Sequence, residues 1–315
     1  MGRHDDIVAA VLAAVRAELE GSPSEPVSVP PQPTPTPPVA PAVLDLPDIA
    51  TPEARRVSGI EAPLDPEGLA ELMAATTARL GTGRAGPRPR TTALLRFQAD
   101  HAVTQDAIYS RVSEELKDRF GLFTVRTMPT DKAEYLLRPD LGRRLTDESR
   151  ATIEQRCVKQ PQVQIVVGDG LSADAIEHNL PAILPVLEQG LTSAGVSLGT
   201  TFFVEFARVG VMNDINEVVG ADVVVILIGE RPGLGIADAM SAYLGWQPGP
   251  GKTDAHRELI CMITDHGGTN PLEAGAYLVE LIRRILAARA SGVARDDTDS
   301  SEPERHATTG ERSRM

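Results

Sequence analysis

The sequence predicts an α/β fold: a Rossmann-like parallel sheet with flanking helices, preceded by a small helical lobe. One observation is the run Val223–Gly235 (VVVILIGERPGLG), whose unbroken, β-branched apolar start indicates a parallel strand covered on both faces. Another is that segments typical of strands and of helices alternate four times after Pro161, which indicates parallel strands joined by right-handed crossovers. Loops after such strands bind ligands, so we expect the functional site near Glu230.

Composition narrows the classes of protein. The chain has 315 residues, of which 42% are apolar and 3% aromatic, so its core must consist of aliphatic side chains. The formal charge of −13 argues against a nucleic-acid partner. Two cysteines fit a reducing cytoplasm, and the absence of a long apolar run predicts no membrane span. Asp5 and Asp6 stand where a secretory signal has basic residues, so we expect a cytoplasmic protein.

The N-terminal region divides into two segments. Residues 1–20 are predicted to form an amphipathic helix, with Ile7, Val11 and Val15 on one line. Residues 21–64 form a Pro-rich linker, which is predicted to be an extended, solvated spacer. A helix held away by a spacer is either a frayed terminus or a docking helix for a partner's groove.

Residues 65–159 are predicted to form the helical lobe, folded from about residue 91. Helices are expected over 65–80, 91–119 and 146–159, with Thr146 or Asp147 as the N-cap of the last one. Residues 135–145 contain a proline and a glycine and are predicted to be a loop.

Residues 160–292 are predicted to form the Rossmann-like domain. Strands are expected over 163–167, 201–206, 223–228 and 259–264, and the helices that follow them end near residues 189, 219, 244 and 289. Asn270 and Pro271 begin the last helix, as N-cap and first helical residue. The four loops are expected to meet at one edge of the sheet. Residues 293–315 are polar and predicted to be disordered.

Gly168–Ala173 matches the dinucleotide fingerprint G-x-G-x-x-A between a strand and a helix. The acidic residue that should bind a ribose about 20 residues later is not at the end of a strand, because Glu188 falls within a predicted helix. An NAD(P)-dependent oxidoreductase is therefore one alternative. The others are a tight turn that opens a helix and a loop around another phosphate-bearing ligand.

The remaining reactive residues form no recognised catalytic pattern. Asp254-x-His256-x-x-Leu259 nearly matches the signature of proteins that donate a histidine to cobalt but lacks its glycine, which favours an exposed loop histidine. Cys261 falls within a predicted buried strand, where inert packing is expected and contact with a ligand is the alternative. Glu230 could pair with Arg231 or accept hydrogen bonds from an amide-rich ligand. The residues alone predict a ligand-binding domain with no catalytic residues of its own.

Six stretches together resemble the small subunit of ethanolamine ammonia-lyase. They are FQADHA (97–102), LLRPDLGRRL (136–145), VQIVVGDGLSADAI (163–176), FFVEFARVGV (202–211), ILIGERPGLG (226–235) and HGGTNPLEA (266–274). The resemblance implies an adenosylcobalamin-dependent ammonia-lyase that converts ethanolamine to acetaldehyde and ammonia by radical chemistry. It also implies a hetero-oligomer in which the large subunit carries the substrate site and this chain covers the cobalamin.

The resemblance assigns cobalamin contacts to Val209, which would pack on the corrin, to Glu230, which would accept hydrogen bonds from corrin amides, and to Cys261. It implies no protein ligand to cobalt and no metal site in this chain, because cobalamin's own benzimidazole stays on the metal. Residues 4–20 resemble the short helices that direct such enzymes into a bacterial microcompartment. The resemblance therefore implies a protein that is located in the cytoplasm or inside such a compartment. A non-enzymatic microcompartment interaction module is the last alternative.

Overall fold

A computed structural model describes Ala13, Thr51, Ala54 and residues 56–76, 78–234 and 236–295. The predicted N-terminal helix over 1–20, most of the predicted linker over 21–64 and most of the predicted tail over 293–315 lie outside the described residues. Within the described ranges, none of the helices is both long and apolar enough to cross a membrane.

The central element is a six-stranded mixed sheet in the order β3-β5-β4-β6-β7-β8. The strands are β3 (Thr124–Arg126), β4 (Val163–Gly168), β5 (Phe202–Glu205), β6 (Val223–Gly229), β7 (Met240–Trp246) and β8 (Arg257–Ile263). The pairs from β3 to β6 are parallel. β7 runs antiparallel to both of its neighbours. The prediction of a parallel α/β sheet is thus confirmed for four adjacent strands.

The predicted series of four parallel strand–helix units is wrong in its third unit. The segment that was expected to be a helix ending near Leu244 is strand β7, which pairs with β6 from Val223↔Trp246 to Gly229↔Met240. β7 is hydrogen-bonded to a strand on each edge and most of its side chains are buried, and this tertiary setting overrides local helix propensity. β8 reverses direction once more, so it ends at the same edge as β6. The loops that follow β4, β5, β6 and β8 therefore still lie at one edge of the sheet, as expected.

The helices agree with the sequence in most places. They are α3 (Pro66–Ala74), α4 (Thr91–Tyr109), α5 (Glu114–Arg119), α6 (Lys132–Leu137), α7 (Asp147–Arg156), α8 (Ala173–Ser193), α9 (Val211–Val219) and α10 (Pro271–Ala288), with 3-10 turns η1 (Leu141–Arg143) and η2 (Asp254–His256) and a short hairpin of β1 (Arg84–Ala85) and β2 (Arg88–Pro89). Thr146 and Asn270 accept the expected N-cap hydrogen bonds.

Two predictions between residues 91 and 145 are wrong. The single helix expected over 91–119 is two helices, α4 and α5, because Ser113 caps the second one with its side chain. The loop expected over 135–145 contains the end of α6 and the turn η1. Strand β3 was not predicted, since three residues are too few to show a period.

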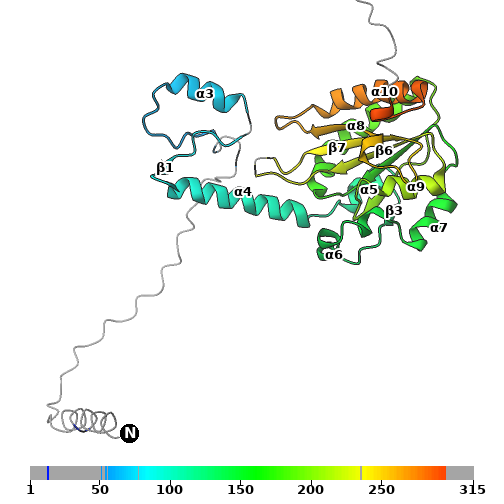
Figure 1. Ribbon diagram of the computed structural model, residues 1–315, viewed down its shortest axis with the longest axis horizontal. Helices are drawn as coiled ribbons and strands as arrows, with labels where there is room; N and C mark the ends of the chain where they lie inside the picture. The colour runs from blue at the N-terminus through cyan, green and yellow to red at the C-terminus, as the bar shows by residue number, and fades with distance from the viewer. Residues whose placement is uncertain are drawn as a thin grey trace, which may run out of the picture. The chain divides into compact units, whose positions relative to one another are not determined.

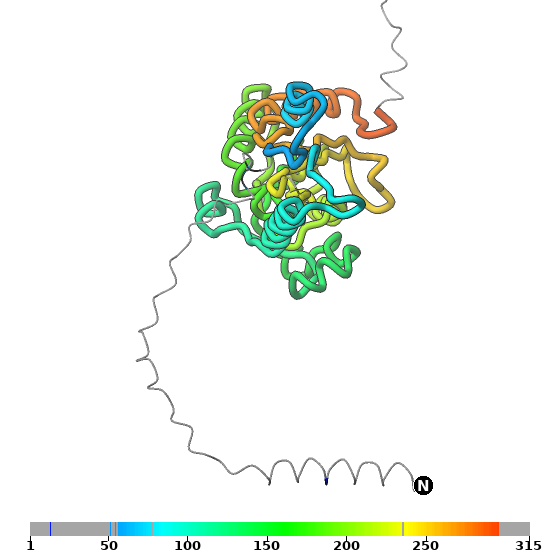
Figure 2. Tube along the Cα trace, turned by 90° about the vertical axis from the view of Figure 1, so that its left-hand side faces the viewer, coloured from blue at the N-terminus to red at the C-terminus, as the bar shows by residue number. Residues whose placement is uncertain are grey.

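The sheet lies between two layers of helices (Figure 1). α8 and α10 cover one face with the first apolar cluster, and α7 and α9 cover the other with the second. Along β6, Val223, Val225 and Leu227 belong to the first cluster, whereas Val224, Ile226 and Ile228 belong to the second. This alternation explains why the whole strand is apolar. In Figure 2 the orange α10 and the green segment of α6 and α7 lie on opposite sides of the yellow strands.

Candidate functional site

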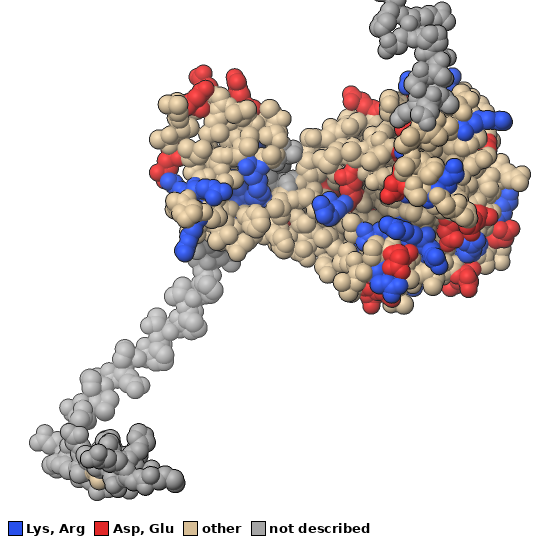
Figure 3. All heavy atoms as spheres, viewed as in Figure 1, with Lys and Arg blue, Asp and Glu red and all other residues tan. Residues whose placement is uncertain are grey.

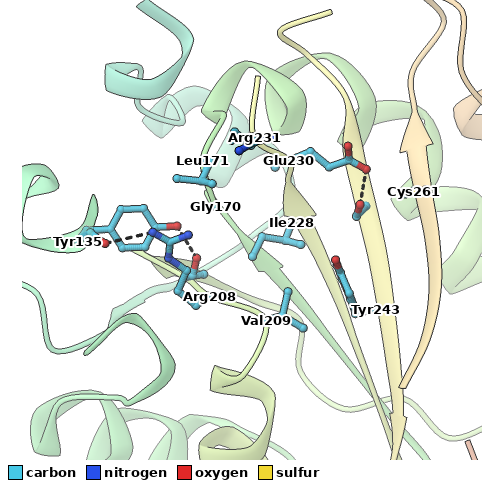
Figure 4. Close-up of a pocket in the computed structure, with 13 residues that line it drawn as sticks. Tyr135, Gly170, Leu171, Arg208, Val209, Ile228, Glu230, Arg231, Tyr243 and Cys261 are labelled. Carbon is cyan, nitrogen blue, oxygen red and sulfur yellow. Dashed lines mark hydrogen bonds between the residues drawn. The ribbon is translucent and has the colours of Figure 1, made fainter. Parts of the chain in front are cut away.

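A cavity of about 370 Å³ lies at the carboxyl edge of the sheet. Val209, Glu230 and Cys261, the three predicted cofactor contacts, all line it, although they come from three separate loops and strands. Figure 4 shows Val209 and Ile228 between the Tyr135–Arg208 pair on one side and Tyr243 with Glu230 on the other. The cavity thus combines an apolar centre with polar groups at its rim.

The Glu230 carboxylate is held by two donors. Its Oε1 accepts hydrogen bonds from the Ser241 hydroxyl and from the Met262 backbone N–H at 2.8 Å. In the described part of the chain no hydrogen bond to Oε2 is found, so that oxygen is available to a ligand. The ion pair considered for Glu230 and Arg231 is not among those of the described residues, and Arg231 is exposed. Glu230 is therefore oriented by hydrogen bonds from β7 and β8.

A β-bulge supplies the second of these donors. Ser241 on β7 lies opposite both Cys261 and Met262 on β8, because Met240 pairs with Ile263 while Ala242 pairs with Ile260. Met262 has a φ of 55°, an uncommon conformation for a residue with a side chain. The bulge turns the Met262 N–H out of the ladder and toward the Glu230 carboxylate. Such local strain is often found at functional sites.

The expectation that Cys261 is buried is wrong. β8 is an edge strand, so its apolar residues are covered on fewer sides than those of β6, and Cys261 is exposed. Its thiol lines the cavity. The sequence did not distinguish an edge strand from a central one, because both read as short apolar runs.

The two cysteines should react with thiol reagents at very different rates. Cys157 is buried, and burial raises the pKa of its thiol to about 11, so little thiolate forms near pH 8. Cys261 is accessible. With iodoacetamide at pH 8, we expect one modified cysteine per chain, located by peptide mass spectrometry at Cys261, and two after denaturation. Fast modification of Cys157 in the native protein would contradict this assignment of burial.

The segment 206–209 places Val209 at the cavity. Each of the three residues before Val209 in this segment donates its backbone N–H in a hydrogen bond. The Asp169 carboxylate accepts hydrogen bonds from the Phe206 N–H at 3.0 Å and from the Ala207 N–H at 2.9 Å, one on each oxygen. The Arg208 N–H donates to the Gly142 carbonyl at 2.9 Å. We call this segment the 206–209 loop.

Two carbonyl groups of the 206–209 loop also accept hydrogen bonds from side chains. The Thr127 hydroxyl donates to the Phe206 carbonyl at 2.7 Å, and the Tyr135 hydroxyl donates to the Ala207 carbonyl at 2.8 Å. Phe206 has a φ of 59°, so the loop adopts a conformation that few side chains favour. Sequence reasoning missed these supporting residues. The one available signal was an acidic residue between the two glycines of Gly168-Asp-Gly170.

Burial dominates the electrostatics beside this loop. Burial raises the pKa of Asp169 to about 6, although the nearby Lys132 charge and the two backbone N–H donors act in the opposite direction. Burial lowers the pKa of Lys132 and raises that of Tyr135, to which the Asp169 charge also contributes. Lys132 donates a hydrogen bond to the Gly170 carbonyl at 3.3 Å.

The glycines of the dinucleotide fingerprint are needed for packing within the chain. A Cβ on Gly170 would overlap the carbonyl oxygen of Gly229, and Gly170 has a φ of 57°. The Leu171 N–H donates to the same carbonyl at 3.1 Å. At the start of α8, Ser172 caps the helix and donates to the Ala237 carbonyl at 2.6 Å. The place where a pyrophosphate would approach is therefore occupied by the chain itself.

His256, the loop histidine of the sequence analysis, and the further histidine His266 do not line this cavity. His256 accepts a hydrogen bond from the Thr253 N–H at 3.1 Å, a local capping contact. His266 lies 2.7 Å from Asp238, beside a second cavity of about 580 Å³. No group of three or more side chains suited to a metal ion occurs among the residues that the structure describes. On the face in Figure 3, charges of both signs are interspersed.

Fold and cavity together define an α/β protein with a cavity at the strand ends, in which apolar side chains lie beside an oriented carboxylate. The family model described as "Ethanolamine ammonia-lyase light chain" matches residues 66–295. An ethanolamine ammonia-lyase small subunit from Clostridium perfringens is 47% identical over 248 residues, which cover 79% of this chain and 84% of the relative. The chain belongs to the ethanolamine ammonia-lyase small-subunit family, so it is one subunit of a lyase complex.

Proposed function

We propose that this chain covers part of the adenosylcobalamin in an ethanolamine ammonia-lyase and holds it through Val209, Glu230 and Cys261. The observation that carries the proposal is that one cavity brings together these three residues, which lie up to 52 positions apart in the sequence (261 − 209). Family membership supplies the reaction class, and the geometry supports the cofactor role of this particular surface.

The residues present fit one portion of a corrin. Val209 and Ile228 offer an apolar surface against which the flat ring would pack. The Oε2 atom of Glu230 would accept a hydrogen bond from one of the amide groups at the ring's edge, a charge-assisted contact stronger than a neutral one. A cavity of about 370 Å³ cannot enclose a molecule as large as cobalamin, so a larger partner subunit would cover the rest.

The work of this chain would be binding and orientation. Adenosylcobalamin, when bound, supplies the radical chemistry by which ethanolamine becomes acetaldehyde and ammonia. Val209 and Ile228 would exclude water from the covered face of the ring. Glu230, oriented by its hydrogen bond from the Met262 N–H, would fix the rotation of the ring. We place no catalytic residue and no cobalt ligand in this chain, and the substrate site in the large subunit.

Co-expression with a candidate large subunit tests this function. We expect the two chains to co-purify and to release acetaldehyde from ethanolamine when adenosylcobalamin is added, whereas neither chain does so alone. Absence of both co-purification and cofactor-dependent product would overturn the proposal. A change in absorbance of a reduced nicotinamide would instead favour the oxidoreductase alternative, against which the packing of Gly170 and Gly229 already argues.

The same experiment includes a chain that lacks residues 1–20. We propose that this segment is a docking helix that directs the complex into a bacterial microcompartment. Its removal should leave acetaldehyde release intact and leave the complex outside purified compartments in a host that makes them. Loss of activity on truncation, or unchanged encapsulation, would contradict a docking role.

A further inference from the structure

We propose that Asp169 is a positioning residue for the cofactor contact at Val209: its buried, ionised carboxylate holds the 206–209 loop in the conformation that lines the cavity. The inference rests on the proposed cobalamin role of the cavity. It also gives a function to the Gly168-Asp-Gly170 motif, which cobalamin contact itself leaves unexplained.

The geometry requires both carboxylate oxygens. Asp169 Oδ2 accepts from the Phe206 N–H and Oδ1 accepts from the Ala207 N–H, so each oxygen serves one donor. The carbonyls of the same two residues are held by Thr127 and Tyr135. Because the backbone at Phe206 is in a rarely adopted conformation, it needs such surrounding contacts to persist.

Protonation removes one of these two contacts. A neutral carboxyl group carries a hydroxyl that must donate, so only one of its oxygens remains a full acceptor toward the two N–H groups. Asp169 is 6% exposed, and water has little access to replace the lost partner. The 206–209 loop then keeps its strained conformation less firmly, although Thr127 and Tyr135 still hold its carbonyls, and Val209 is less well positioned at the cavity.

The charged and titratable groups around Asp169 come from several elements. They are Lys132 and Tyr135 on α6, Glu205 at the end of β5, Arg208 in the 206–209 loop, and Arg111 before α5, which acts on Lys132. Lys132 is the largest favourable charge for the ionised form of Asp169, whereas Glu205 opposes it. Removal of the Lys132 charge should therefore raise the pKa of Asp169.

The test measures cyanocobalamin affinity of the co-purified complex by equilibrium dialysis between pH 5 and pH 8. With the native residue, affinity should weaken about tenfold as pH falls through about 6, because one charged hydrogen bond is lost. Asp169→Asn should be about tenfold weaker at pH 8 and should lose this pH step. Lys132→Met should shift the midpoint of the step to higher pH.

A stability measurement separates positioning from a merely structural role. The folded-state pKa of about 6 lies above the ordinary value of 3.8, so the contribution of Asp169 to stability is largest at low pH and is lost as pH rises through about 6. Binding should change in the opposite direction. The difference in unfolding midpoint between the native complex and Asp169→Asn should therefore depend on pH.

Each outcome decides between the two proposals. If the native complex binds cyanocobalamin with no step near pH 6, or if Asp169→Asn keeps the step, the positioning role is wrong while the proposed function stands. If the native complex binds none at any pH, the proposed function fails. Should Asp169→Asn not assemble, Lys132→Met decides alone, and an unmoved midpoint overturns the inference.

Discussion

Glu230→Gln should weaken cobalamin binding by about 10- to 100-fold while the fold remains intact. The amide oxygen of glutamine can replace Oε1 and accept from Ser241 and from the Met262 N–H. The amide nitrogen that replaces Oε2 donates hydrogen bonds and cannot accept one from a corrin amide. Loss of a hydrogen bond to a charged group costs about 1.5–3 kcal/mol, which corresponds to the stated range. Equilibrium dialysis of the complex with cyanocobalamin measures it.

Glu258→Gln is the matched control. Glu258 lies on β8, accepts from the Gly292 N–H at 3.1 Å and from Arg295 at 2.6 Å, and does not line the cavity. Cobalamin affinity of this variant should equal that of the unchanged complex. Urea unfolding followed by the fluorescence of Trp246, the single tryptophan, should show similar midpoints for Glu230→Gln and the unchanged chain. The midpoint of Glu258→Gln should be lower, because this variant loses the charge that pairs with the largely buried Arg295. Equal affinities for the two variants would remove Glu230 from the binding site.

The sequence predicts the layers of the fold better than the direction of its strands. β6 is recognisable because burial on both faces demands an unbroken apolar run. β7 has the same surroundings, but its sequence MSAYLGW contains small and polar residues and follows a glycine-rich loop. Only the antiparallel pairing with β6 and β8 makes it a strand. That pairing depends on contacts between segments, which a local period does not contain.

The candidate site shows the same limit. The position of Glu230 follows from the rule that loops after parallel strands meet at one edge. Its orientation depends on a bulge in β8, and the shape of the 206–209 loop depends on Thr127, Tyr135 and Asp169. These supports come from parts of the chain far apart in sequence, so no motif of fixed spacing describes them. Resemblance to a family supplied Val209 and Cys261, which residue chemistry alone did not single out as a set.

Gly229→Ala should destabilise the chain by about 3 kcal/mol or more, which is the upper end of what overpacking costs. A Cβ at this position would overlap the carbonyl oxygen of Ser172 and lie 2.5 Å from that of Asp169. Both are backbone atoms of the β4–α8 loop, so no side chain can rotate away to relieve the overlap. Native proteins are stable by only about 5–15 kcal/mol, and the urea midpoint should therefore fall markedly.

Gly249→Ala gives the comparison for Gly229→Ala, since a Cβ on Gly249 would meet no atom within 4 Å. Its stability should change by no more than about 0.5 kcal/mol. The Gly229 substitution should also displace the backbone of Asp169, and with it the acceptor for the Phe206 N–H. Lower stability and a changed cavity would then occur together, because both depend on the close approach of the end of β6 to the β4–α8 loop. If the two alanine variants unfold at the same urea concentration, Gly229 is not required for that approach.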